Sequence, residues 1–252
     1  MLLELSCSNF KSIKEQITFS MIASTDTSYE EELYQFQNYR VSRLSSIYGA
    51  NASGKTTLIS AIGYLVFLIT QCTKFHDEDK IPRAPHKLAS KEPTTFDIQF
   101  VVDEIRYAYG FSISDEEVLE EYLYHFPSGR QAKIFERKQD KFEFGQKYQK
   151  ELKEICTKTK NNKLFLSVSE AWSKLPEIIN PFNFFRKTIL VHANDSENWF
   201  EYSANKIRSD KKMKNILIKF MQQIGVPIKD IEIKIENLPI PSNDTSFSLN
   251  DR

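Results

Sequence analysis

The chain has 252 residues and no net charge, because 34 Lys and Arg residues balance 34 Asp and Glu residues. This balance excludes the strong overall positive field that draws a protein to DNA or to an anionic membrane. Hydrophobic residues make up 40% of the chain and charged residues 27%, which is ordinary for one large soluble domain or two small ones. The cysteines, Cys7, Cys72 and Cys156, lie far apart, a pattern typical of reduced thiols and not of a disulfide framework or zinc site.

Neither a signal peptide nor a membrane span is expected. The acidic residue Glu4 lies at the start of the chain, and no basic region stands before an apolar stretch, as it would in a signal peptide. The longest apolar run, from Tyr64 to Thr70, is too short to cross a bilayer. We therefore expect a cytoplasmic protein without membrane contact.

The N-terminal elements are predicted to be two strands joined by a turn. Leu2 to Ser6 alternates weakly and Ile17 to Ser20 is the returning strand, with Asn9-Phe10-Lys11-Ser12 as the turn between them. The acidic, tyrosine-rich segment from Asp26 to Tyr39 is predicted to be a loop with a short helix.

A complete phosphate-binding motif follows. It fits G-x-x-x-x-G-K-S/T at every fixed position. The segment from Leu44 to Tyr48 is short and β-capable, and apolar residues recur at helical spacing from Thr57 onward, so the motif has a predicted strand before it and a helix after it. The eight residues of the motif are Gly49, Ala50, Asn51, Ala52, Ser53, Gly54, Lys55 and Thr56.

The residue types of this P-loop predict a site for ATP and Mg²⁺. Gly49 and Gly54 allow the backbone N–H groups to curl toward phosphate oxygens, where the positive end of the following helix also lies. Lys55 is expected to reach the β- and γ-phosphates, and the Thr56 hydroxyl to ligate Mg²⁺. The Asn51 amide either reaches the γ-phosphate or a facing subunit, or forms a local Asx turn.

Beyond the P-loop helix the pattern changes to strands. Asp77 to Pro93 is rich in proline and charge and is predicted to be a connector. Phe96 to Val102 and Ile105 to Phe111 alternate around Asp-Glu, which predicts an antiparallel hairpin. Val118 to Phe126 and Lys133 to Arg137 are predicted to be further strands of that sheet.

The C-terminal part is predicted to be mainly helical. Lys147 to Pro176 is lysine-rich with helical spacing, and Phe165 and Trp172 are its expected packing residues. Lys187 to His192 is predicted to be a short strand, and the helix after it is best defined by Met213 to Ile224. Its end is followed by one more predicted strand, Ile228 to Ile235.

Basic residues gather on this last predicted helix, where they form either a nucleic-acid surface or an ordinary solvated face. They are Lys206, Arg208, Lys211, Lys212, Lys214 and Lys219.

The Asn9–Ser12 turn, together with Ile47-Tyr48 and the P-loop, resembles the start of RecF, SMC and OLD-type ATPases, which are ABC-type P-loop enzymes. The likeness is strongest to prokaryotic AAA-type ATP-binding proteins of abortive-infection and other phage-defence systems. It extends into Phe96 to Phe100, Tyr107 to Phe111 and Ile134 to Arg137.

This resemblance implies an ATP-operated homodimer that sandwiches each nucleotide between two subunits. It places the turn beside the nucleotide, so Lys11 and Ser12 join Thr57 among the expected nucleotide contacts, the alternative for Lys11 being a solvated surface lysine. The expected fold is α/β: a mixed sheet around the P-loop helix, an antiparallel β subdomain and a helical insertion. The expected divisions are the ATPase core (1–75), the β subdomain (94–145), the helical insertion (146–187) and an incomplete return to the core (188–252).

Two parts that such an ATPase needs, a Walker B strand and an L-S-G-G signature helix, are not recognised after residue 190. Ile98 to Glu104 imitates Walker B, but Gln99 interrupts it, and Leu166 to Glu170 imitates a signature without its glycines. Val191 to Asp195 stands where the family's Q-loop is expected, without a Gln. We therefore expect the N-terminal portion of a longer ATPase, inactive on its own, and the catalytic residues stay unassigned.

The leading interpretation is an ATP-binding sensor or regulator in phage defence that acts with an effector protein, a nuclease or a toxin. The alternatives are a nucleotide-responsive scaffold without hydrolysis and a DNA-associated repair ATPase like RecF or SMC. A GTPase has no support, since Asn205 to Arg208 lacks the Asp of N-K-x-D. A metal cluster is not expected at His76, His86 or His125, which have no partner at ligand spacing.

Overall fold

The computed structural model describes residues 1–51, 53–191 and 196–233. The chain forms two compact units, Met1–Ala193 and Asn194–Arg252. The first contains the sheet and the P-loop, and the described residues of the second form two helices.

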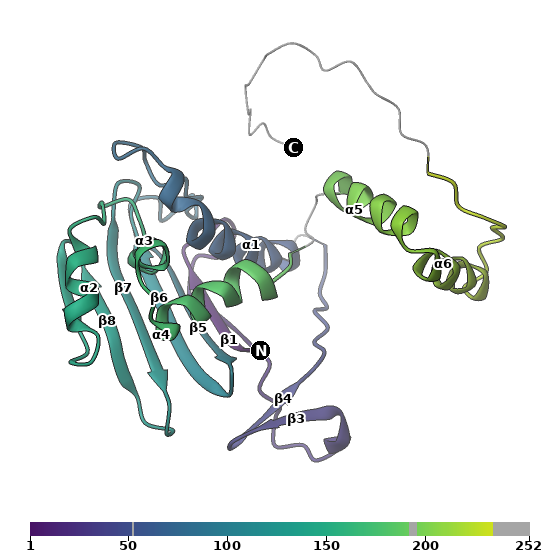
Figure 1. Cartoon of the computed structure of the whole chain (residues 1–252), viewed down its shortest axis with the longest axis horizontal. Coiled ribbons are helices and arrows are strands. Elements are labelled where there is room, and N and C mark those ends of the chain that lie inside the picture. The colour runs from purple at the N-terminus through teal and green to yellow at the C-terminus, as the bar shows by residue number, and fades with distance from the viewer. Residues whose placement is uncertain (52, 192–195, 234–252) are drawn as a thin grey trace, which may run out of the picture. The chain divides into compact units, whose positions relative to one another are not determined.

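One seven-stranded sheet, in the order β2-β1-β5-β6-β7-β8-β9, is the centre of the first unit (Figure 1). All the recorded pairings between its strands are antiparallel, so the predicted mixed sheet is wrong for the described residues. Because β1 pairs with β5, the expected ATPase core and β subdomain share this sheet. The strands are β1 (Leu2–Ser8), β2 (Ile17–Ser20), β5 (Thr94–Val102), β6 (Ile105–Ile113), β7 (Val118–Phe126), β8 (Ala132–Lys138) and β9 (Lys141–Phe144).

A separate two-stranded hairpin replaces the loop predicted for residues 26–39. The 3₁₀ turn Glu30–Glu32 is followed by β3 (Leu33–Phe36) and β4 (Tyr39–Ser42). Phe36 and Val41 pack with Leu3 and Val101 in a small core cluster. The prediction missed this hairpin because its few apolar residues show no clear alternating pattern. They are buried instead by contact with the larger sheet.

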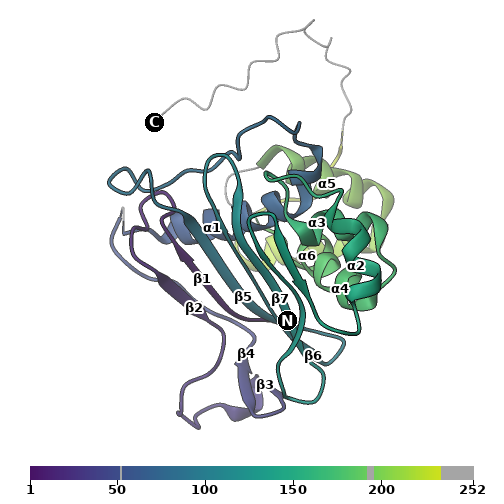
Figure 2. The ribbon, with the colours of Figure 1, turned by 90° about the vertical axis from the view of Figure 1, so that its left-hand side faces the viewer.

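Helices cover one face of the large sheet (Figures 1 and 2). Leu65 of the P-loop helix, Phe96 of β5 and Phe165 belong to one continuous core, and Phe100 stacks on Phe184 with 4.3 Å between ring centroids. The elements of this layer are α1 (Lys55–Gln71), the 3₁₀ turn Cys72–Lys74, α2 (Gln149–Cys156), α3 (Phe165–Trp172), α4 (Pro176–Asn183) and the π-helical turn Phe184–Thr188.

Helix α1 is also the only helix among the described residues that is long and apolar enough, together with the turn up to Lys74, to cross a membrane by length and composition. It starts at the P-loop, and four of its residues are buried in the core of the first unit. That packing is typical of a core helix in a globular domain. The four residues are Ala61, Leu65, Leu68 and Ile69.

Several predicted details of the helical layer change. Phe165 is fully buried as predicted, but Trp172 is 60% exposed and instead lies under the Lys158 ammonium, 3.3 Å from its ring centroid. The strand predicted from Lys187 to His192 is wrong in its described part. The π-helical turn runs to Thr188, and residues 189–191 form no strand; residue 192 lies outside the described residues.

The strand predicted before the P-loop is also absent. Leu44 to Tyr48 pairs with no strand among the described residues, and Leu44 and Tyr48 are 79% and 89% exposed. A β-capable sequence forms a strand only where a neighbouring strand supplies hydrogen bonds and an apolar face. No described neighbour does so here.

The second unit contains α5 (Ser196–Ser209) and α6 (Lys211–Gln223). Asp210 separates them, and its Oδ1 accepts hydrogen bonds from the backbone N–H groups of Lys212 and Met213, both at 3.0 Å. Such an N-cap begins a new helix. The basic residues expected on one helix are therefore divided between two. The predicted strand from residue 228 is absent up to residue 233, and its remainder lies outside the described residues.

Candidate nucleotide-binding site

The P-loop ends at the N-terminus of α1. Gly54 is the N-cap residue and has φ 95°, a left-handed conformation that favours glycine. No side chain caps this helix end, and its first turn contains no acidic residue. The helix therefore presents backbone N–H groups and a positive dipole end to an anion.

Lys55 lies back over the loop that precedes it. Its ammonium donates hydrogen bonds to the carbonyl oxygens of Gly49 at 2.8 Å and of Ala50 at 2.7 Å. An ammonium has three donors, so one remains for a phosphate oxygen. Thr56 is exposed at the start of the helix, where its hydroxyl is free of core packing. Of the eight predicted residues, Ala52 lies outside the described residues.

The structure brings the Asn9–Ser12 turn next to the P-loop helix. Ser12 Oγ and Thr57 Oγ1 share a hydrogen bond of 2.8 Å, although 45 residues separate them in the sequence. Lys11 is exposed, and its ammonium lies 5.7 Å from the ring centroid of Phe10. Of the turn residues that the resemblance places beside the nucleotide, Ser12 therefore contacts the P-loop helix, and Lys11 precedes it in the chain.

Asn9 holds this turn against a distant loop, a role that the sequence did not reveal. Its buried Nδ2 donates to the carbonyl oxygens of Ala89 at 2.9 Å and Glu92 at 2.7 Å, and its Oδ1 accepts from the His86 backbone N–H at 2.8 Å. Asn9 also has φ 51°, which asparagine tolerates better than most residues. The only sequence signal was an asparagine at a predicted turn.

A hollow of about 510 Å³ lies between this turn and the anchored loop. Ser12 belongs both to this hollow and to the contact with Thr57, so the hollow adjoins the N-terminal turn of α1. Its other lining residues include two lysines and a histidine, which give it basic character. They are Lys11, Ala84, Pro85, His86 and Lys87.

Replacing Asn9 by glycine should lower the free energy of unfolding by at least about 1 kcal/mol, the net value of one typical buried hydrogen bond, because several such bonds are lost. Glycine tolerates the positive φ, so the loss would report the amide contacts and not backbone strain. Urea unfolding followed by circular dichroism measures the change. Asn38→Gly, at an exposed position, is the control, and equal midpoints for the two variants would refute the anchoring role.

The segment that imitates Walker B is a hairpin turn, as predicted. Asp103 and Glu104 join β5 to β6 with φ 48° and 58°, and Glu104 accepts a hydrogen bond from the Tyr34 hydroxyl at 3.1 Å. Thr94, at the start of β5, donates to the Asn9 carbonyl at 2.8 Å. Nine strand residues of about 3.3 Å each place Glu104 roughly 30 Å from that end. Glu104 is therefore remote from the P-loop side of the sheet.

The other candidate residues do not form a catalytic arrangement in the described chain. Leu166 to Glu170 belongs to α3, where Ser167 donates to the Ile69 carbonyl oxygen at 2.6 Å and Ser169 is fully buried. Residues 192–195 of the predicted Q-loop lie outside the described residues. Within the described ranges, no three His, Cys, Asp or Glu residues are grouped for a metal ion.

Comparison with protein families gives a match over most of the chain. Residues 44–249 match the family model described as "AAA domain, putative AbiEii toxin, Type IV TA system". A comparison with curated proteins gave no match. The matched region contains the whole P-loop and spans most of the 252 residues. An AAA domain implies nucleotide binding, typically with Mg²⁺. Because the match covers more than half of the residues, the chain belongs to this family of AAA domains and is a P-loop nucleotide-binding ATPase module.

Proposed function

We propose that the protein is the ATP-binding module of an ABC-type ATPase of the RecF/SMC/OLD-like group. The observation that carries this proposal is the hydrogen bond between Ser12 and Thr57, since it joins the Asn-Phe-Lys-Ser turn to the P-loop helix. The resemblance gives this turn a place beside the nucleotide.

Each group at the P-loop fits a part of Mg-ATP. The uncapped N–H groups at Gly54 and beyond suit phosphate oxygens, and Lys55 has a donor to spare for them. The exposed Thr56 hydroxyl is a hard oxygen ligand of the kind that Mg²⁺ prefers. Lys11 and Lys87, at the adjoining hollow, add positive charge near the remainder of the nucleotide.

The biological role that we propose is that of a cytoplasmic sensor or regulator in prokaryotic phage defence. The family description names a toxin and a toxin–antitoxin system, which agrees with a partner effector such as a nuclease or toxin. A homodimer that sandwiches ATP is proposed from the resemblance. Calorimetry with Mg-ATP, followed by light scattering with a non-hydrolysable ATP analogue, tests binding and dimerisation separately.

Residues 1–252 alone should hydrolyse ATP far more slowly than 1 s⁻¹, the order of magnitude of slow ordinary enzymes. Hydrolysis needs a carboxylate that orients water and charges that stabilise the γ-phosphate. The Asp103–Glu104 turn cannot provide the first, because it lies at the far end of β5. Steady-state phosphate release measures the rate, with Lys55→Ala as the blank. Turnover near 1 s⁻¹ would contradict this prediction, and the scaffold alternative would lose its basis.

A DNA-associated repair ATPase is the second candidate, favoured by the basic residues of the two C-terminal helices. Fluorescence anisotropy with duplex DNA at two salt concentrations separates it from the first, because phosphate contacts weaken steeply with salt. The residues concerned are Lys206 and Arg208 on α5, and Lys211, Lys212, Lys214 and Lys219 on α6.

A further inference from the structure

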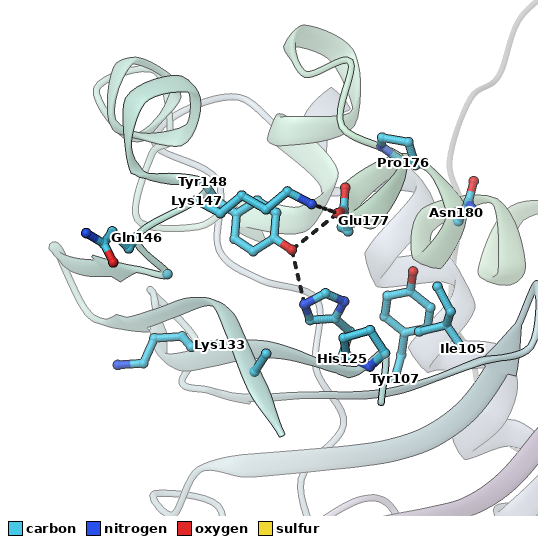
Figure 3. Close-up of a pocket in the computed structure, with 13 residues that line it drawn as sticks. Ile105, Tyr107, His125, Lys133, Gln146, Lys147, Tyr148, Pro176, Glu177 and Asn180 are labelled. Carbon is cyan, nitrogen blue, oxygen red and sulfur yellow. Dashed lines mark hydrogen bonds and ion pairs between the residues drawn. The ribbon is translucent and has the colours of Figure 1, made fainter. Parts of the chain in front are cut away.

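A second hollow, of about 580 Å³, lies between the sheet and the helical layer (Figure 3). Strands β6 and β7 contribute Tyr107 and His125, the loop before α2 contributes Tyr148, and α4 contributes Glu177 and Asn180. None of its lining residues belongs to the proposed nucleotide site. Its volume is that of a small-molecule pocket.

A chain of hydrogen bonds crosses one wall of this pocket (Figure 3). Lys147 Nζ lies 2.6 Å from Glu177 Oε1, and the Tyr148 hydroxyl lies 3.2 Å from the same oxygen and 3.1 Å from His125 Nε2. Burial alone raises the pKa of Glu177, but hydrogen bonds from Lys147, its own backbone and Tyr148 outweigh burial and lower that pKa. Glu177 is therefore an ionised carboxylate, which only accepts hydrogen bonds.

The positions of the protons in this chain of hydrogen bonds follow from which groups can donate. Burial, followed by the charge of Glu177, raises the pKa of Tyr148, so the phenol keeps its one proton and donates it to Glu177. The Tyr148 oxygen then accepts from an N–H at His125 Nε2. Burial lowers the pKa of His125, so the ring is neutral and Nδ1 is left as an acceptor without a proton.

This acceptor has no partner. His125 is 7% exposed, and no described residue bonds to Nδ1, an arrangement that is rare because it costs stability. The ring of Tyr107 lies beside it, with 6.2 Å between ring centroids. Burial raises the pKa of Tyr107, so its hydroxyl is neutral too, and Figure 3 shows it pointing toward α4. The pocket thus offers two uncharged polar groups to an occupant.

The charged groups of the pocket are already paired. Lys147 bonds to Glu177, and the Lys133 ammonium lies 2.7 Å from Glu136 and 2.8 Å from Glu143. A charged occupant would lose its hydration without gaining an unpaired counter-charge, so the pocket suits an uncharged molecule. The rest of its wall is largely apolar and includes Ile105, Pro127, Ala132 and Pro176.

We propose that this pocket binds an uncharged heteroaromatic ring that carries an N–H donor, which bonds to His125 Nδ1. Aromatic side chains from both layers, Tyr107 and Tyr148, suit a flat apolar ring. Because Nδ1 is enclosed, the bond requires a small shift of the His125 and Tyr107 side chains. Binding therefore changes the NMR signals of the His125 ring. This site is independent of ATP binding at the P-loop.

The test uses four probes that carry no phosphate group, which is the part of a nucleotide that the P-loop binds. Indole and adenine carry an N–H donor, 1-methylindole has lost it, and benzoate is charged. Saturation-transfer NMR should detect indole or adenine, with 1-methylindole and benzoate at least tenfold weaker. His125→Phe should lower the affinity for the bound probe at least tenfold and remove the shifted histidine signals.

Two further variants test the proposal in case His125→Phe does not fold. Tyr107→Phe removes only a hydroxyl in the pocket, which can donate to a ring nitrogen of adenine but has no partner on indole, and should weaken adenine binding at least threefold. Tyr122→Phe is the matched control, because Tyr122 lies on β7 outside the pocket and its hydroxyl bonds to Asp97 of β5. The absence of binding by both N–H probes, equal binding of 1-methylindole or benzoate, or equal effects of the two tyrosine variants on adenine binding would each overturn the proposal.

Discussion

Replacing Lys55 by alanine should lower the affinity for Mg-ATP at least tenfold, which is about 1.4 kcal/mol of binding free energy. Two effects act together. The phosphates lose the cation that lies at the loop, and the loop loses the hydrogen bonds that tie the Gly49 and Ala50 carbonyl oxygens to the ammonium. Without those bonds the backbone N–H groups are less well organised for an anion. Isothermal calorimetry with Mg-ATP measures the change.

Lys74→Ala is the matched control for this experiment. Lys74 lies just beyond the other end of the same helix, and its ammonium bonds to the Gln71 side chain. Its loss removes the same charge from the protein without touching the P-loop, so the affinity should stay within twofold. An unchanged affinity in Lys55→Ala, with equal unfolding midpoints for both variants, would refute the assignment of the nucleotide site.

Local patterns predicted the parts of this fold that local interactions form. The P-loop and α1 were predicted because glycine positions and helical spacing act within a few residues. The hairpin at Asp103–Glu104 was predicted because the alternation is mirrored on both sides of the turn. In both segments the residues that interact lie close together in the sequence, so the prediction needs no knowledge of distant contacts.

Elements that depend on distant partners were the ones predicted wrongly. Leu44 to Tyr48 has strand composition but no neighbouring strand among the described residues. Trp172 looked like a core residue, yet it is exposed and pairs with Lys158. Ile189 packs on the core beside the π-helical turn and not within a sheet. Composition alone does not say which surface is available to each segment.

In the candidate site, too, the features that depend on local sequence were predicted and those that depend on distant contacts were not. The P-loop was recognised from its motif, and the place of Lys11 and Ser12 came from the resemblance. The buried amide of Asn9 and the aromatic pocket around His125 were missed, since each joins residues from segments far apart in the chain. His125 in particular has no neighbour at ligand spacing in the sequence, so no pattern points to it. Only the fold brings it to Tyr148 and Glu177.

The largest effect on stability should come from Arg137→Met, which leaves a buried carboxylate without its cation. Arg137 and Glu121 are both fully buried and lie 3.8 Å apart. Arg137 also donates to the carbonyl oxygens of Gln139 and Lys163, both at 2.6 Å. Removal of one partner of such a pair typically costs about 3–5 kcal/mol. Urea unfolding measures the loss, and Arg130→Met, at an exposed position, should change stability by less than about 0.5 kcal/mol.

The pH dependence of the Arg137→Met variant separates this mechanism from simple loss of packing. Burial raises the pKa of Glu121 in the folded protein, although Arg137, the backbone N–H groups of Phe165 and Leu166, and Tyr109 act against it. Without Arg137 the folded pKa rises further above the unfolded value. The folded state then binds more protons than the unfolded state, so stability falls as the pH rises through the folded pKa.

Arg137→Met should therefore be least stable at neutral pH and regain part of its loss as the pH is lowered toward 5. The double variant Glu121→Gln/Arg137→Met should lack this dependence, because glutamine has no proton to gain, and it should be more stable at pH 7 than Arg137→Met alone. A double-mutant cycle compares the wild type, the two single variants and the double variant. Its coupling free energy isolates the interaction between Glu121 and Arg137. A loss in Arg137→Met that is the same at pH 5 and pH 7 would assign the effect to packing against Phe142, over whose ring the guanidinium lies.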